Sequence, residues 1–142
     1  MSPFDDDDEH LAGFDEEGDW KPAPGLLLHH GTSSTMLASI RDHGMRSGSH
    51  WGSRRVAEYF ARANCRDHQG SPVILSVRLD ALDIRHLRQD DGMIEFPIFS
   101  DYDRRQCLWE EADYPGWRLC LQLYEAIICD AAIPWHMIHQ DQ

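Results

Sequence analysis

The sequence predicts an α+β fold in which helices flank one small β-sheet, and three observations predict it. Apolar residues occupy every second position from Val73 to Leu79, which is typical of a half-buried strand. At two other places, apolar residues at helical spacing follow serines suited to capping a helix. The segments succeed one another as strand, helix, strand, helix, strand, loop and strand, an order that favours the α+β class.

The first half of the fold is predicted over residues 26–79. An apolar run from residue 26 ends in Gly31 and predicts a buried strand over 26–32. A helix is predicted over 33–43, because Gly44 follows it as a helix-ending glycine. A short strand around residues 50–51, a helix over 53–65 and the strand over 73–79 complete this half.

The second half is less regular. Residues 80–103 are charged and interrupted by glycine and proline, so they are predicted as irregular. A helix is predicted over 103–113 and a strand over 123–129, because the latter segment is apolar and rich in β-branched residues near its end. A last helical turn is predicted over 133–138.

Length and composition point to one globular domain. The 142 residues, 42% of them hydrophobic and five of them tryptophan, suffice for a single core. No apolar stretch approaches the length of about 18 residues that a membrane span needs, and no signal peptide is visible. Without either segment, we expect a cytoplasmic protein. A net charge of −12 argues against direct binding to nucleic acid, so we expect a protein or another macromolecule as the partner.

The acidic charge is concentrated in residues 1–24, which hold nine acidic residues and one basic residue. Like charges in a row repel one another, so we predict a disordered leader over 1–24 and a folded domain over 25–142. Such a leader either keeps the protein soluble or docks on a basic partner.

Cysteines and histidines show no metal-binding spacing. None of the four cysteines forms a C-x-x-C pair, and the nine histidines have no accompanying ligand pattern. We therefore predict free thiols and no metal.

Three segments together resemble the ADP-ribosyltransferase superfamily. The first is an apolar strand that runs into H-G-T-S and then I-x-x-x-G; the second is a helix with A-x-Y followed by a central strand. The third is a strand with a glutamate followed by I-P-x-x-x-I. They lie in the family's order at residues 28–44, 53–77 and 124–138, and the resemblance implies a small split sheet with flanking helices.

The resemblance also implies a site for NAD as substrate. The match is to the His-Tyr-Glu branch, which includes poly(ADP-ribose) polymerases and diphtheria-like toxins. It implies that His30 bonds the adenosine ribose, and that Gly31, beside Thr32, holds the nicotinamide amide through its backbone. It implies that Tyr59 stacks on the nicotinamide ring. Glu125 would then bond the nicotinamide ribose and be catalytic together with His30.

These residue types suit the chemistry. Nicotinamide leaves with its bonding electrons, so the ribose gains positive charge that a carboxylate stabilises. An aromatic face offers a flat stacking platform, and a glycine permits close approach of the backbone. Trp51 and His50 are alternative lining residues, and Glu110 and Glu111 are alternative carboxylates.

The leading hypothesis is a mono-ADP-ribosyltransferase of the toxin, effector or phage-modifier type that acts on a macromolecule. Residues 122 and 123 are not acidic, so an arginine-modifying E-x-E enzyme is not expected. One alternative is a tRNA 2′-phosphotransferase, which shares the H-G-T opening. Another is a catalytically degenerate fold that acts as an acidic binding or inhibitor protein. The leading hypothesis expects Glu125→Gln to abolish nicotinamide release without unfolding the protein.

Overall fold

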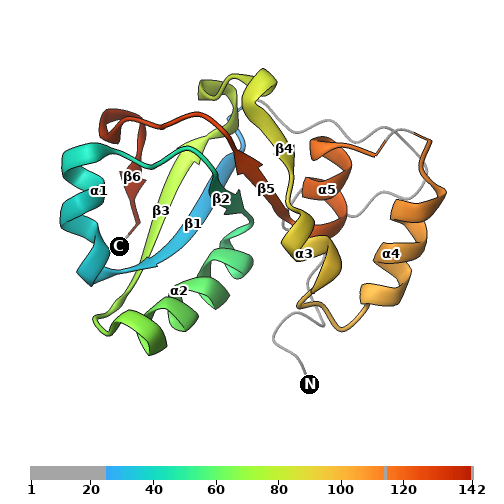
Figure 1. The fold of residues 1–142 in the computed structure, drawn as a ribbon, viewed down its shortest axis with the longest axis horizontal. Helices are drawn as coiled ribbons and strands as arrows, with labels where there is room; N and C mark the ends of the chain where they lie inside the picture. Colours follow the sequence, from blue (N-terminus) through green and yellow to red (C-terminus); the bar gives the residue numbers. More distant parts are fainter. Residues whose placement is uncertain (1–24, 114, 142) are drawn as a thin grey trace.

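The computed structural model describes residues 25–113 and 115–141, which form one antiparallel sheet with helices around it (Figure 1). The predicted α+β class is confirmed. The acidic leader predicted over 1–24 lies outside the described residues. In the described part of the chain, no helix is long and apolar enough to cross a membrane.

The sheet has six strands in the order β4-β5-β2-β1-β3-β6. The strands are β1 (Leu27–Ser33), β2 (Ser49–Gly52), β3 (Pro72–Arg78), β4 (Leu87–Gln89), β5 (Ala126–Cys129) and β6 (His139–Gln140). The helices are α1 (Leu37–His43), α2 (Arg54–His68), α3 (Asp91–Glu95), α4 (Tyr102–Glu111) and α5 (Trp117–Tyr124). Short 3₁₀ turns are η1 (Ser34–Met36), η2 (Leu79–Ala81), η3 (Ile84–His86) and η4 (Trp135–Met137).

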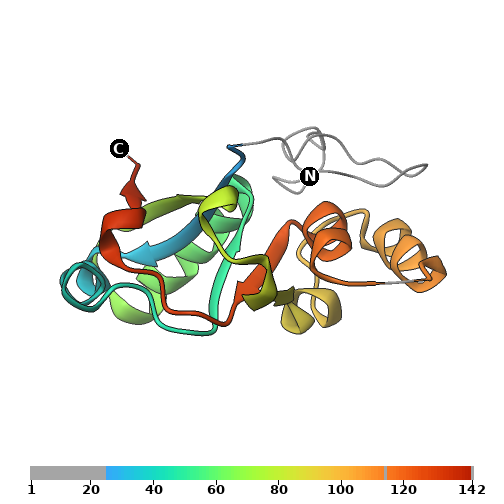
Figure 2. The ribbon, with the colours of Figure 1, turned by 90° about the horizontal axis from the view of Figure 1, so that it is seen from above.

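The sheet is split between β1 and β2. These two strands pair only at His29 and Gly52, whereas β1 and β3 pair continuously from Leu27–Arg78 to Ser33–Pro72. The sheet therefore has two halves, β1-β3-β6 and β4-β5-β2. Figure 2 shows α3, α4 and α5 extending the molecule beyond the β4–β5 end, while α1 and α2 lie beside β1 and β3.

Helix α2 packs directly on β1. Ser53 caps the helix by accepting a hydrogen bond from the backbone N–H of Val56. A Cβ atom on Gly31 would lie 1.8 Å from the carbonyl oxygen of Ala57 and 2.6 Å from the backbone nitrogen of Ala61. Gly31 is thus required by the close contact of helix and strand.

Two hydrophobic clusters hold the domain together. The larger one joins the two sheet halves, because it includes Leu28 and Leu75 from one half and Trp51 and Ile127 from the other. The second lies among α3, α4 and α5 and is centred on residues such as Leu123. Burial of these side chains stabilises both the sheet and the helices at its end.

Most predicted elements are confirmed within a few residues, but the strand predicted over 123–129 is wrong at its start. Helix α5 continues to Tyr124, Glu125 adopts a left-handed conformation (φ 59°), and β5 begins only at Ala126. Leu121 packs into the larger cluster while its neighbours pack into the second. Because α5 is buried on two sides, its apolar run resembles that of a strand.

The segment predicted as irregular, 80–103, contains β4, α3 and two 3₁₀ turns. These elements are short, and tertiary contacts fix them. Strand β4 pairs with β5, and Asp90 caps α3 through its side chain. The two-residue strand β6, which lies in the C-terminal segment, pairs with β3 and was not predicted.

Candidate functional site

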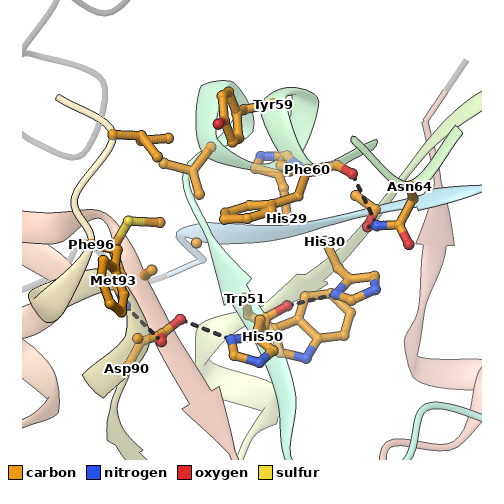
Figure 3. Close-up of a pocket in the computed structure, with 17 residues that line it drawn as sticks. His29, His30, His50, Trp51, Tyr59, Phe60, Asn64, Asp90, Met93 and Phe96 are labelled. Carbon is orange, nitrogen blue, oxygen red and sulfur yellow. Dashed lines mark hydrogen bonds and ion pairs between the residues drawn. The ribbon is translucent and has the colours of Figure 1, made fainter. Parts of the chain in front are cut away.

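A pocket of about 460 Å³ lies at the split of the sheet (Figure 3). That volume is in the range of small-molecule sites. Its described walls come from β1, β2, α2, the α3 region and the first residue of β5. The polar and aromatic lining residues are His29, His30, His50, Trp51, Tyr59, Phe60, Asn64, Asp90 and Phe96.

His30 lies on the pocket wall with a fixed ring orientation. Its Nδ1 is 2.6 Å from the carbonyl oxygen of His50, so Nδ1 carries the proton and donates it. Burial lowers the pKa of His30, which keeps the ring neutral at pH 7. Its Nε2 is therefore a hydrogen-bond acceptor, suited to a ligand hydroxyl.

The ring of Trp51 packs against the ring of His30. The two rings lie 5.4 Å apart, and the indole N–H donates to Ser49 Oγ at 2.7 Å. Trp51 is buried in the larger cluster, so it is both a core residue and a lining residue. The sequence predicts Trp51 as a lining residue, and its position in the pocket wall favours that prediction.

The structure divides the H-G-T motif. Gly31 lines the pocket, and its carbonyl oxygen accepts a hydrogen bond from Asn64 Nδ2 at 3.4 Å. Thr32 is buried and does not belong to the lining. His29 lines the pocket as well as His30, and its Nδ1 lies 3.5 Å from the carboxylate of Asp141.

Tyr59 and Phe60 form an aromatic rim on α2. Their rings meet edge to face at 5.2 Å, and Tyr59 is 38% exposed. Figure 3 shows them on the opposite side of β1 from His30 and Trp51. Phe96, which is 73% exposed, also lines the pocket. Tyr59 is thus a partly exposed lining residue rather than a core residue.

Glu125 does not line the pocket. Its side chain is 1% exposed and forms a bidentate pair with Arg55, with Nε to Oε1 at 2.9 Å and a second contact from Nη2 to Oε2. Arg105 Nη1 lies 3.6 Å from the same carboxylate. Both guanidinium groups lie over the ring of Phe99. The carboxylate predicted to be catalytic is therefore part of a buried charge network.

The network ties three elements together beside the pocket. Arg55 comes from α2, Arg105 from α4, and Glu125 joins α5 to β5. The backbone oxygen of Glu125 accepts a hydrogen bond from the N–H of Ser53 at 3.0 Å. The alternative carboxylates Glu110 and Glu111 are exposed on α4, outside the lining.

A histidine–aspartate pair that the sequence did not reveal lies on the pocket wall. His50 Nδ1 is 2.8 Å from Asp90 Oδ2; His50 is 61% exposed and Asp90 only 6%. The hydrogen bond to Asp90 raises the pKa of His50 despite partial burial. Burial alone would raise the pKa of Asp90, but hydrogen bonds from His50, Met93 and Gly92 together lower it.

The sequence predicts His50 as an alternative lining residue, whereas Asp90 lies in the segment predicted as irregular. The one sequence feature that could have indicated Asp90 is its residue type, since aspartate is a preferred N-cap residue of helices. Its carboxylate does cap α3, because Oδ1 accepts a hydrogen bond from the N–H of Met93 at 3.2 Å. The same side chain therefore both begins α3 and orients His50.

Neither similarity to known proteins nor metal-ligand geometry assigns a function to the site. The chain matches no family model and no curated protein. Among the described residues, no group of three or more His, Cys, Asp or Glu side chains is placed to hold a metal ion. The resemblance to ADP-ribosyltransferases remains a prediction from the sequence motifs.

Proposed function

We propose that the pocket binds NAD and that the protein transfers ADP-ribose from it to a macromolecular acceptor. The observation that carries this proposal is that one pocket at the split of the sheet is lined by His30 and Trp51 on one side of β1 and by Tyr59 on the other. His30 and Tyr59 belong to separate motifs that resemble the same family, and Trp51 is one of the alternative lining residues predicted from the sequence. Their place in the lining of one pocket supports the resemblance.

Each group has a use in binding a dinucleotide. The acceptor nitrogen of His30 suits a ribose hydroxyl, because its other nitrogen already donates to His50. The exposed ring of Tyr59 offers a face for the nicotinamide ring. Gly31 brings backbone to the pocket wall, although the packing of α2 explains the glycine on its own.

Glu125 enters the proposal as a structural residue. A carboxylate that reaches a ribose hydroxyl must be available to it, whereas this one is committed to Arg55 and lies close to Arg105. The pairing stabilises the start of β5, whose first residue, Ala126, lines the pocket. Glu125 then positions the wall of the site.

The same pairing favours a second candidate function, an NAD-binding module without transferase activity. Among the described lining residues, Asp90 is the only carboxylate, and it is hydrogen-bonded to His50. A site that binds NAD but offers no group for the transfer would retain the pocket and lose the chemistry. Nicotinamide release distinguishes the two functions.

The test measures NAD binding and nicotinamide release by the wild-type protein and two tyrosine variants. NAD at 100 times its dissociation constant should stabilise the wild type by about 2.7 kcal/mol, seen as a higher melting temperature. Tyr59→Ala should lose most of this effect. Tyr102→Ala is the matched control, because Tyr102 is exposed on α4 and lies outside the pocket.

Stabilisation with nicotinamide release supports the transferase. Stabilisation without release, in the presence of cell lysate as a source of acceptors, supports the binding module. If NAD neither stabilises the protein nor is consumed, both functions are excluded.

A further inference from the structure

The His50–Asp90 pair has the geometry of an oriented general base. Asp90 is buried and held in place by its role as the cap of α3, so the carboxylate is fixed before any ligand binds. It engages Nδ1 of His50 at 2.8 Å. This fixes the proton on Nδ1 and leaves Nε2 as the basic nitrogen. No described residue hydrogen-bonds Nε2.

The pair is also part of the proposed NAD site. His50 and Asp90 both line the pocket, and the backbone carbonyl of His50 is the group that orients His30 (Figure 3). The half-exposed ring of His50 is open to solvent and therefore to an incoming acceptor. The pair thus lies between the ligand site and the outside of the protein.

We propose that His50 is the general base that takes a proton from a serine or threonine hydroxyl of a protein substrate as ADP-ribose is transferred to it, with Asp90 as its positioning residue. This inference rests on the proposed transferase function. It names the acceptor class and a base that the family motifs do not supply.

The step balances without a further reactant. The bond between ribose C1′ and the nicotinamide nitrogen breaks, and nicotinamide leaves with the electron pair. The acceptor oxygen forms a bond to C1′, and its proton passes to Nε2 of His50. Asp90 stabilises the resulting imidazolium, which then releases the proton to solvent.

The chemistry favours a hydroxyl over a guanidinium acceptor. Histidine is an effective base toward hydroxyl groups, which lose their proton in the transition state. A hydroxyl oxygen can attack through its lone pair and lose its proton as the bond forms, whereas a guanidinium, which stays protonated with a pKa above about 12, must lose its proton before it can attack. The net charge of −12 favours a protein hydroxyl over one on nucleic acid.

The pH dependence follows from the charges around His50. Asp90 raises the pKa of His50, whereas Arg88 on β4 opposes that rise, and His30 also lies nearby. Because the base must be deprotonated, transfer should increase as pH rises through the pKa of His50. Replacing Asp90 by a neutral residue should move this increase to lower pH.

The experiment measures two quantities between pH 5 and 9, stabilisation by NAD and ADP-ribosyl transfer to small probes. The hydroxyl probe is N-acetylserinamide, the guanidinium probe is agmatine, and an RNA oligonucleotide offers nucleic-acid hydroxyls. The variants are His50→Asn and Asp90→Asn; asparagine retains the capping ability that α3 needs. The matched control is His86→Asn, because His86 is also half-exposed and near an aspartate, Asp83, but outside the pocket.

We expect His50→Asn to lower transfer to the serine probe by about 100-fold or more, compared at NAD concentrations that saturate each protein. Asp90→Asn should cause a smaller loss of transfer and move the pH profile of transfer to lower pH. The pKa of His50, measured by NMR, should decrease to match. His86→Asn should behave as the wild type.

Each contrary result has a distinct meaning. A wild type that neither binds NAD nor releases nicotinamide overturns the proposed function and this inference with it. A wild type that transfers ADP-ribose while His50→Asn keeps its rate and pH profile overturns this inference alone. Preferential transfer to agmatine or to the RNA overturns the assignment of a protein hydroxyl.

Discussion

The side chain of Glu125 illustrates how one residue's role depends on its partners. A buried carboxylate is costly unless its charge is compensated, and Arg55 and Arg105 provide that compensation. Arg105 is itself almost fully buried, and its Nε also pairs with Asp101 Oδ1 at 2.7 Å. At this position charge balance inside the protein, rather than contact with a ligand, explains the glutamate.

The variant Glu125→Gln is therefore expected to be destabilised. Removing one partner of a buried ion pair weakens the compensation of the charges that stay buried, so the free energy of unfolding should fall, by up to about 3–5 kcal/mol. Urea unfolding monitored by circular dichroism measures this loss. Glu111→Gln, an exposed position on α4, should stay within about 0.5 kcal/mol of the wild type.

The sequence motifs predict that Glu125→Gln abolishes activity in an intact fold, but the buried pairing with Arg55 makes destabilisation a second cause of lost activity. Loss of activity in that variant would not identify a catalytic carboxylate unless its stability were unchanged. An unfolding midpoint equal to that of the wild type would contradict the structural role.

At the scale of elements, the contact between β1 and α2 determines the shape of the pocket. Helix α2 approaches β1 so closely that the strand has room for glycine only at position 31, against the backbone of Ala57 and Ala61. The same approach brings Tyr59 and Phe60 to the rim. The helix thus connects the stability of the fold with the position of the aromatic rim.

Gly31→Ala should separate α2 from β1. The added methyl group would meet backbone atoms, which cannot rotate away as a flexible side chain could. We therefore expect the free energy of unfolding to fall by about 1–3 kcal/mol or more, the usual effect of overpacking. Thermal unfolding provides the measurement. Gly92→Ala is the control, because the new Cβ would meet only Asp90 Oδ1, at 3.4 Å; equal stability of the two variants would contradict the close packing.

At the scale of the whole molecule, one hydrophobic cluster compensates for the split in the sheet. Strands β1 and β2 share a single residue pair, which contributes little on its own. The larger cluster spans the split, since Leu28 and Leu75 pack in it together with Trp51 and Ile127. The pocket can therefore lie between the two halves without dividing the domain into two.

This arrangement predicts a single cooperative unfolding transition. Tryptophan fluorescence should report on both clusters, since Trp51 lies in the larger one and Trp109 packs against the second, and far-ultraviolet circular dichroism should report on all helices and strands. The two signals should have the same midpoint in urea. Two separate transitions would show that the β4-β5-β2 half unfolds independently of the β1-β3-β6 half.

Local patterns in the sequence predicted the elements whose stability is mostly local. The alternation over 73–79 identified β3, and Ser53 with the apolar spacing after it identified α2. The end of α5 was mispredicted, because a helix buried on two sides has the same apolar run as a strand. The short strand β4 was missed because its pairing with β5 depends on residues distant in the chain.

The sequence by itself determined the α+β class, most of the helices and strands, and His30, Gly31, Trp51 and Tyr59 as candidate pocket residues. Only the tertiary structure decided how charge is distributed around the pocket. Glu125 pairs with a residue 70 positions away, and His50 with one 40 positions away. Such partners are set by the folding of distant segments onto one another, and no local spacing encodes them, because a side chain's charge and accessibility depend on which groups pack against it.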